Sequence, residues 1–192
     1  MNCSKSNMFL SGIPPEEKIK LSVSMNLEVG ELPFKYLGVP ITSSKLKRSD
    51  CKLLIHKIVG RINSWRNKFL SYAGRLLLIK AVLFSIQVYW SSIFILPSSV
   101  HKEIDGILRN FLWSGAAMDW KKAKVAWDEV CVPKVEGGLG IMRCKAWNKA
   151  AIIKNMWKIL LDKGNSLWVE WIKANRLRGK SFWEIKPNSE SS

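Results

Sequence analysis

Apolar side chains recur every three or four residues in three consecutive stretches of the chain, 49–69, 73–96 and 98–115. This spacing places the apolar positions on one face of an α-helix. In the first stretch the apolar face consists of Cys51, Leu54, Ile55, Ile58, Ile62, Trp65 and Phe69. Ser49 is a suitable N-cap for that helix. Three amphipathic helices joined by short connections predict a helical bundle.

The remaining C-terminal sequence alternates between irregular and helical patterns. Pro97 ends the second helix, and the Ser98-Ser99 pair is suited to capping the third. Residues 116–141 break the pattern and predict an irregular connection with a small hairpin. Helical spacing resumes over 147–161 and 166–176. In the first of these helices the residues expected to face inward are Ala150, Ala151, Met156, Trp157 and Leu160.

Two patterns near the N-terminus concern strands. Over 14–29 apolar residues alternate as in a strand, but the Pro14–Glu17 start is typical of a helix, and we favour the helix. Over 32–42 two prolines bracket a short aromatic and β-branched run with Gly38 inside it, which predicts a tight β-turn-β element. The fold class is therefore mainly α, a helical bundle with a small β element near the N-terminus.

The charge of the chain points to anionic partners. It carries 31 Lys and Arg against 15 Asp and Glu, a net charge of +16. This excess favours phosphate, on nucleic acid or on an anionic membrane, over an uncommitted basic surface. Ten tryptophans favour nucleic acid, because aromatic rings also stack on bases. The candidate binding residues are Lys45, Lys47, Arg48, Lys52, Lys57, Arg61, Arg66, Lys68 and Arg75. Plain solvation of a helix face is the alternative interpretation.

Other kinds of site find little support in the sequence. The four cysteines form no C-x-x-C pair, so we expect reduced thiols in an intracellular protein. The uncharged run over 81–100 is too polar for a membrane span. Gly179-Lys180-Ser181 is a relaxed phosphate-loop pattern preceded by a helical stretch rather than a strand. His56 and His101 are expected on helix surfaces, and no catalytic or metal-binding residue is predicted.

Several short motifs in a fixed order give a family resemblance. They are Leu32–Thr42, Leu70–Arg75, Phe111–Gly115, Ala126-Trp127, Pro133-Lys134 and Gly137–Gly140. In this order they resemble the plant-type non-LTR (LINE-type) retrotransposon reverse transcriptases. The resemblance implies the end of the palm and a primer-grip hairpin over 1–44, a helical thumb over 45–115, a connection with C-terminal helices over 116–186 and a frayed tail over 187–192.

The resemblance also implies roles for single residues. Tyr36, Leu37 and Gly38 would form the primer grip, and Lys5 would be the lysine that closes the palm. The family's aromatic-x-Asp-Asp motif occurs nowhere in the chain, so the chain alone should not polymerise. Mg²⁺ is expected only in a full-length parent, in which a zinc-binding region and often a ribonuclease H domain would follow.

Together these expectations describe a non-catalytic fragment of an RNA-directed DNA polymerase. It would bind RNA–DNA or DNA duplex through its basic helical face, and it would pack against the palm and the zinc-binding region of its parent. The expected location is intracellular, and nuclear by family resemblance, with no membrane partner. The alternative is a structural or interaction module without independent activity.

Overall fold

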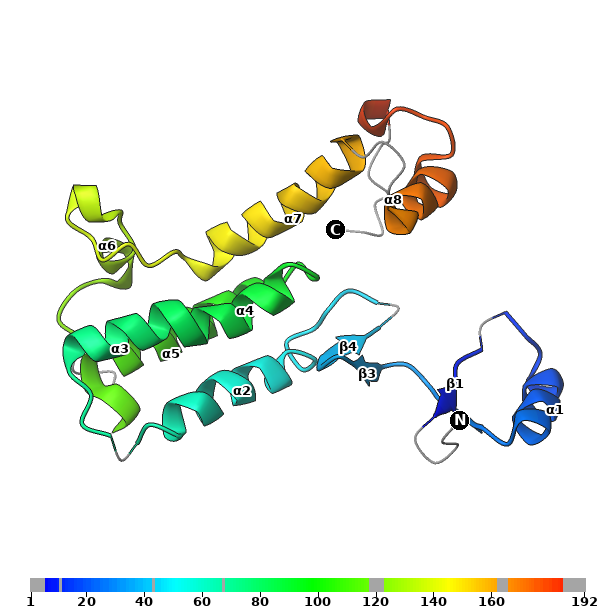
Figure 1. Cartoon of the computed structure of the whole chain (residues 1–192), viewed down its shortest axis with the longest axis horizontal. Helices are drawn as coiled ribbons and strands as arrows, with labels where there is room; N and C mark the ends of the chain where they lie inside the picture. The colour runs from blue at the N-terminus through cyan, green and yellow to red at the C-terminus, as the bar shows by residue number, and fades with distance from the viewer. Residues whose placement is uncertain are drawn as a thin grey trace. The chain divides into compact units, whose positions relative to one another are not determined.

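The computed structural model describes residues 6–10, 12–42, 44–66, 68–117, 123–161 and 166–184 (Figure 1). The chain forms two compact units, Met1–Lys45 and Leu46–Ser192. Helices predominate, and the strands are confined to two small sheets in the first unit. The predicted fold class, mainly α with a small β element near the N-terminus, is confirmed. The finer division of the chain into four segments stays a prediction.

The ambiguous stretch over 14–29 forms a helix. α1 spans Pro15–Met25, begins with Glu16 and Glu17 in its first turn, and ends at Asn26 in a left-handed conformation (φ 51°). It connects β1 (Asn7–Met8) to β2 (Glu28–Val29), which pair in parallel. The proline start and the acidic first turn suit the N-terminal end of the helix dipole, which explains why the helical interpretation is confirmed over the alternating pattern.

The predicted β-turn-β element is an antiparallel hairpin of β3 (Phe34–Tyr36) and β4 (Val39–Ile41). Leu37 and Gly38 form its two-residue loop with φ of 49° and 80°. Two positive φ angles give a turn whose twist matches that of the strands, and glycine adopts this conformation without steric cost. Phe34 stacks on Phe9 with ring centroids 3.9 Å apart, which anchors the hairpin within the first unit.

The second unit is a bundle of helices. α2 (Lys52–Asn63) and α7 (Cys144–Leu161) lie on either side of α4 (Phe84–Ser91), as Figure 1 shows. α3 (Tyr72–Leu78) continues into α4 through a π-helical turn at Ile79–Leu83, and α5 (Ser98–Ser114) packs against α2, α3 and α7. The fully buried core includes Leu54, Ile58, Leu83, Ile104 and Phe111. These residues come from the predicted apolar faces.

The first bundle helix is shorter than predicted at both ends. Ser49 lies in a preceding turn, where its hydroxyl lies 3.1 Å from a carboxylate oxygen of Asp50, and Cys51 is the N-cap. Asp50 accepts a hydrogen bond of 2.8 Å from the backbone N–H of Lys47, so the turn is closed before the helix starts. At the other end the helix stops at Asn63, which leaves Phe69 outside it and fully exposed.

The second predicted helix also ends early, because a side chain takes over the backbone hydrogen bonding. The side-chain amide of Asn148 on α7 donates to the carbonyl oxygens of Ser91 (2.8 Å) and Phe94 (2.7 Å). Its Oδ1 accepts the N–H of Leu96 at 2.9 Å. The chain therefore leaves the helix at Ser91 instead of Leu96. α5 begins at Ser98 after Pro97, and neither predicted serine caps it through its side chain.

The long helix over Tyr72–Ser91 is, by length and composition only, apolar enough to cross a membrane, with a mean hydropathy of 1.3. It is the one such helix in the described ranges. A core helix passes the same test. Within this helix Ile79, Leu83 and Trp90 are buried. Gln87 is also buried, and its side-chain amide donates a hydrogen bond of 2.6 Å to the Ser91 hydroxyl.

The connection after α5 is irregular, as predicted. It contains the short helix α6 (Trp127–Val130) and a 3₁₀ turn at Lys134–Glu136. The glycine-rich turn folds back on this segment, because Gly140 donates its N–H to the Val132 carbonyl at 3.0 Å. A Cβ at Gly138 would lie 2.0 Å from that same carbonyl oxygen, so this position requires glycine.

The C-terminal helices expose more apolar surface than predicted. On α7 only Cys144 and Asn148 are buried, whereas Met156 and Trp157 are exposed instead of facing inward. The reason is that α7 contacts α4 along its first part and extends beyond the end of α4 (Figure 1). α8 (Leu167–Ile172) and a π-helical turn at Lys173–Leu177 follow, and Val169 is buried there.

Replacing Asn148 with alanine should lower the free energy of unfolding by about 2–3 kcal/mol, because buried backbone groups of Ser91 and Leu96 and a part-buried carbonyl of Phe94 lose their partner. Chemical denaturation of the full chain measures this. Asn155→Ala is the matched control, since Asn155 makes one exposed hydrogen bond of 2.8 Å to the Ser92 carbonyl. The control should lose less than about 1 kcal/mol. Equal losses would contradict the central role of Asn148.

Candidate nucleic-acid interface

The candidate interface is built on α2. Its fully buried residues Leu54, Ile58 and Ile62 repeat every four residues and face the core. The other faces carry Lys52, His56, Lys57 and Arg61, all exposed, and the helix contains no acidic residue. Solvated helices normally mix charges of both signs, so a helix with cations alone is suited to an anionic partner.

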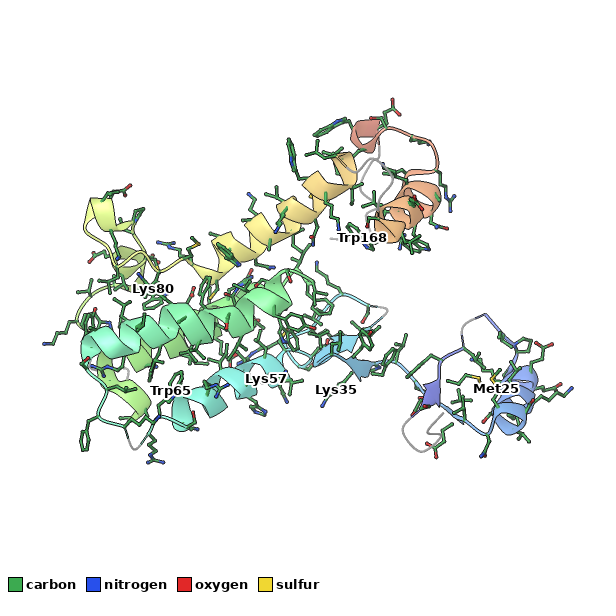
Figure 2. The ribbon with its side chains drawn as sticks, viewed as in Figure 1. Met25, Lys35, Lys57, Trp65, Lys80 and Trp168 are labelled. Carbon is green, nitrogen blue, oxygen red and sulfur yellow. The ribbon has the colours of Figure 1, made fainter. Side chains whose placement is uncertain are left out.

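One flank of α2 forms a hollow of about 360 Å³. It is lined by Lys57, Gly60, Arg61 and Ser64, with Ile86 of α4 on the other side. Lys57 and Arg61 lie one helical turn apart, and Gly60 between them has no side chain (Figure 2 labels Lys57). In the described part of the chain neither cation forms an ion pair. This hollow therefore offers two free positive charges beside accessible backbone.

The opposite flank of α2 is less positive. A hollow of about 520 Å³ there includes Arg48, Lys52, His56 and Glu103. Arg48 donates through Nε and Nη2 to one carboxylate oxygen of Glu103 on α5, at 3.1 and 3.0 Å. Because this ion pair offsets the charge of Arg48, Lys52 is the cation of this flank without an ion pair in the described structure.

The last group of cations lies beyond the end of α2. Arg66, Lys68 and Arg75 line a separate hollow of about 400 Å³ together with Trp65 and Phe69. The end of α5 closes it through Phe111 and Gly115. The ring of Trp65 lies 5.7 Å from that of Phe111 (Figure 2 labels Trp65). Cations and aromatic rings therefore share one concave surface.

The nine predicted binding residues thus do not form one row. Seven of them line three separate hollows, with Arg48 and Lys52 in one, Lys57 and Arg61 in another, and Arg66, Lys68 and Arg75 in the third. Lys47 is exposed in the turn before α2, and Lys45 belongs to the first unit. Their role in binding stays a prediction.

The sequence reasoning missed some lining residues. Gly60 and Ser64 have a signal in the sequence, because each lies three residues after a cation of α2 and so on the same flank. Ile86 has none, since only tertiary packing brings it to the hollow. Phe69 was assigned to the apolar stripe, but it lies in the loop after the helix with its ring fully exposed.

The residues assigned to the primer grip lie in the first unit. Tyr36 ends β3, and Leu37 and Gly38 form the hairpin loop. Both Tyr36 and Leu37 are exposed. Lys5, the predicted palm-end lysine, lies outside the described residues.

The relaxed phosphate-loop pattern does not have the geometry of a phosphate loop. It follows the π-helical turn after α8, and the N–H of Ser181 donates to a carboxylate oxygen of Glu184 at 3.0 Å. The N–H of Lys180 donates to the Leu177 carbonyl at 2.9 Å. These backbone donors are engaged locally, whereas a phosphate loop directs several of them at its ligand.

The half-buried Lys80 and the cysteine side chains have structural rather than catalytic surroundings. Lys80 (labelled in Figure 2) donates a hydrogen bond to the Leu139 carbonyl and so holds the glycine-rich turn in place. Burial and the nearby charge of Lys134 lower the pKa of Lys80. Burial raises the pKa of Cys51 and that of Cys131 to about 11, which keeps both thiols protonated. In the described ranges no three His, Cys, Asp or Glu side chains gather as metal ligands.

His101 is buried, although the sequence predicted it on a helix surface. It lies on the face of α5 that Leu96 and Asn148 cover, at the base of an apolar hollow of about 390 Å³. Burial lowers its pKa, and the positive charge of Lys145 acts in the same direction. The carboxylate of Asp105 and hydrogen bonding to Asn148 and Leu96 oppose this shift. The folded protein therefore holds His101 neutral.

Comparison with known proteins bears on the assignment. No protein-family model matches the chain. The chain is similar to a protein from Arabidopsis thaliana that is provisionally named a ribonuclease H protein, with 38% identity over 157 residues. The match covers 80% of this chain and 25% of that protein, so the chain spans about a quarter of the length of this relative.

This match contradicts the assignment to the non-LTR reverse transcriptases. The relative is named a ribonuclease H protein, and no reverse transcriptase model matches. The polymerase-fragment and thumb assignments are therefore wrong. The roles given to Tyr36, Leu37 and Gly38 as single residues stay predictions. A physical reason for the error is that the motifs behind the family assignment describe local backbone structure. Leu70–Arg75 holds the Ser71 cap of α3, and Gly137–Gly140 is a tight turn, neither of which is specific to a chemistry.

The neutral His101 predicts acid sensitivity. The unfolded chain gains this proton near the ordinary value of 6.5 and the folded chain only at lower pH. The contribution of His101 to stability is therefore complete above pH 6.5 and is lost as the pH falls through its lowered pKa. Denaturation at pH 7.5 and at about pH 5 should show a smaller acid loss in His101→Gln than in the unaltered chain. His56→Gln, at an exposed position, should keep the full acid loss.

Proposed function

We propose that the chain supplies a nucleic-acid-binding surface to a ribonuclease H-like protein, and that Lys57 and Arg61 on α2 contact the phosphate backbone. The observation that carries the proposal is the hollow where both cations lie exposed on one flank, without an acidic partner in the described structure. The name of the Arabidopsis relative supports it, since ribonuclease H acts on nucleic acid. So does the net charge of +16.

The geometry favours contact with phosphates over contact with bases. Four residues of α-helix rise about 6 Å, so Lys57 and Arg61 can contact successive positions along one strand. Gly60 between them lets the backbone of a ligand approach the helix closely. Phosphate contacts carry no sequence information and release counterions. The binding is therefore independent of sequence and sensitive to salt.

A second function, docking against another part of a larger protein, is favoured by a separate observation. Large apolar side chains are exposed on and after α7, namely Ile153, Trp157, Leu161, Leu167, Trp168 and Trp171 (Trp168 is labelled in Figure 2). Large apolar side chains exposed in such number are typical of interaction surfaces. The two functions use different helices and are compatible.

The binding experiment uses the full chain and three labelled probes of one sequence: an RNA–DNA hybrid, a DNA duplex and single-stranded RNA. Fluorescence anisotropy over a series of salt concentrations gives the affinity and its salt slope. We expect binding to the hybrid and the duplex that weakens steeply with salt. Affinity that does not change with salt, or no binding at low salt, would refute the proposal. A preference for the hybrid would connect the chain to the substrate of ribonuclease H.

Replacing Lys57 and Arg61 together with alanine should weaken binding at low salt by about tenfold and reduce the salt slope by about 2. Both residues are exposed, so the fold should be unaffected. The matched control is Lys154→Ala with Lys158→Ala, which removes two exposed cations at the same spacing from α7. The control should bind almost as the unaltered chain does. Equal losses would show that net charge alone drives binding.

A further inference from the structure

The hollow at the end of α2 differs from the two beside the helix. It lies between the loop that leads into α3 and the last turn of α5, and its volume of about 400 Å³ is in the range of small-ligand pockets, roughly 300–1,000 Å³. Among the residues that the structure describes, its lining includes the cations Arg66, Lys68 and Arg75 and no acidic residue. It is therefore a site for an anion rather than a balanced polar surface.

Among the three cations that line this hollow, Arg75 is the one that is not exposed. Its side chain is half-buried, and the buried Nε has no hydrogen-bond partner in the described structure. Its Nη1 lies 3.3 Å from the point that a Cβ on Gly115 would occupy, and Gly115 has a φ of +66°. The glycine thus leaves room for the guanidinium group. A buried donor without a partner is costly. The same guanidinium group carries further N–H donors on its two Nη atoms, and these can bind a phosphate oxygen.

Aromatic rings accompany the cations. The ring of Phe69 is fully exposed, so its position in the loop is not explained by packing. Trp65 is half-buried and rests 5.7 Å from the buried ring of Phe111. Exposed aromatic rings beside cations are the arrangement with which proteins bind unpaired nucleotides, because the ring stacks on a base while the cation binds the phosphate.

We propose that this hollow binds one unpaired nucleotide, with its phosphate at Arg75 and its base stacked on the exposed ring of Phe69. The proposal rests on the proposed function only in that the ligand is nucleic acid. Lys57 and Arg61 line a different hollow and bind the paired region. The hollow at the end of α2 instead binds a nucleotide at an unpaired end or gap. An acidic protein segment would use the cations but would gain nothing from a base-stacking ring.

The test compares three labelled probes with the same paired region: a blunt duplex, the duplex with a three-nucleotide overhang, and the same overhang without bases. Polyglutamate is added as a competitor to the blunt duplex and to the overhang. The full chain should bind the overhang at least about fivefold more tightly than the blunt end, and the abasic overhang should lose most of this preference. An abasic overhang that binds as well as the complete one would overturn the stacking role.

Phe69→Ala should abolish the preference for the overhang and leave blunt-duplex affinity unchanged, since the ring is fully exposed and makes no core contact. Trp157→Ala, which removes an exposed ring from α7, is the matched control and should retain the preference. Arg75→Gln should weaken binding to the overhang and not to the blunt duplex. Its folding is checked by denaturation, and Arg75→Lys should restore part of the preference.

The outcomes separate the two proposals. If the blunt duplex is bound in a salt-dependent way but the overhang is not preferred, the nucleotide hollow is refuted and the function on α2 stands. If no probe binds at low salt, the proposed function fails. Polyglutamate that displaces the overhang as readily as the blunt duplex, together with an unchanged preference in Phe69→Ala, would assign the hollow to an acidic protein partner and overturn the proposal.

Discussion

Burial of one apolar stripe on α2 sets the geometry of the whole candidate interface. Leu54, Ile58 and Ile62 are fully buried, so the helix cannot turn about its axis without exposing them. Each such side chain contributes roughly 1.5–3 kcal/mol when removed from water, which far exceeds the strength of a surface ion pair. The hydrophobic core therefore determines which way Lys57 and Arg61 face, and electrostatics acts on a helix already fixed in place.

The periodicity of the sequence predicted the helices well and their ends poorly. The apolar spacing in the sequence identified most of the buried residues of α2 and α5, because the face of a helix that packs against the core is the face that carries its apolar residues. The ends depend on side chains distant in sequence. The side chain of Asn148 on α7 forms hydrogen bonds with the backbone at the end of α4, and the sequence around Ser91 contains no pattern that predicts this. Asp50 likewise displaces Ser49 as the residue that closes the turn before α2.

The sequence names candidate binding residues but not their arrangement in space, and their role in binding stays a prediction. Seven of the nine candidate cations line three hollows, and their division among these hollows depends on where α4 and α5 pack. Glu103 could not be foreseen as the partner of Arg48, which lies 55 positions away. The family assignment failed for a related reason: short glycine, proline and tryptophan motifs report turns and packing, which proteins of different activity share.

The π-helical turn at Ile79–Leu83 affects which neighbours the helix packs against before and after the turn. A single π turn contains one residue more than an α-helical turn, and one residue corresponds to about 100° of rotation. The faces before and after it are therefore offset, so that α3 meets α5 while α4 meets α2 and α7. Deleting one residue there would straighten the helix into a continuous α-helix and swing Gln87 and Trp90 away from the neighbours they now touch.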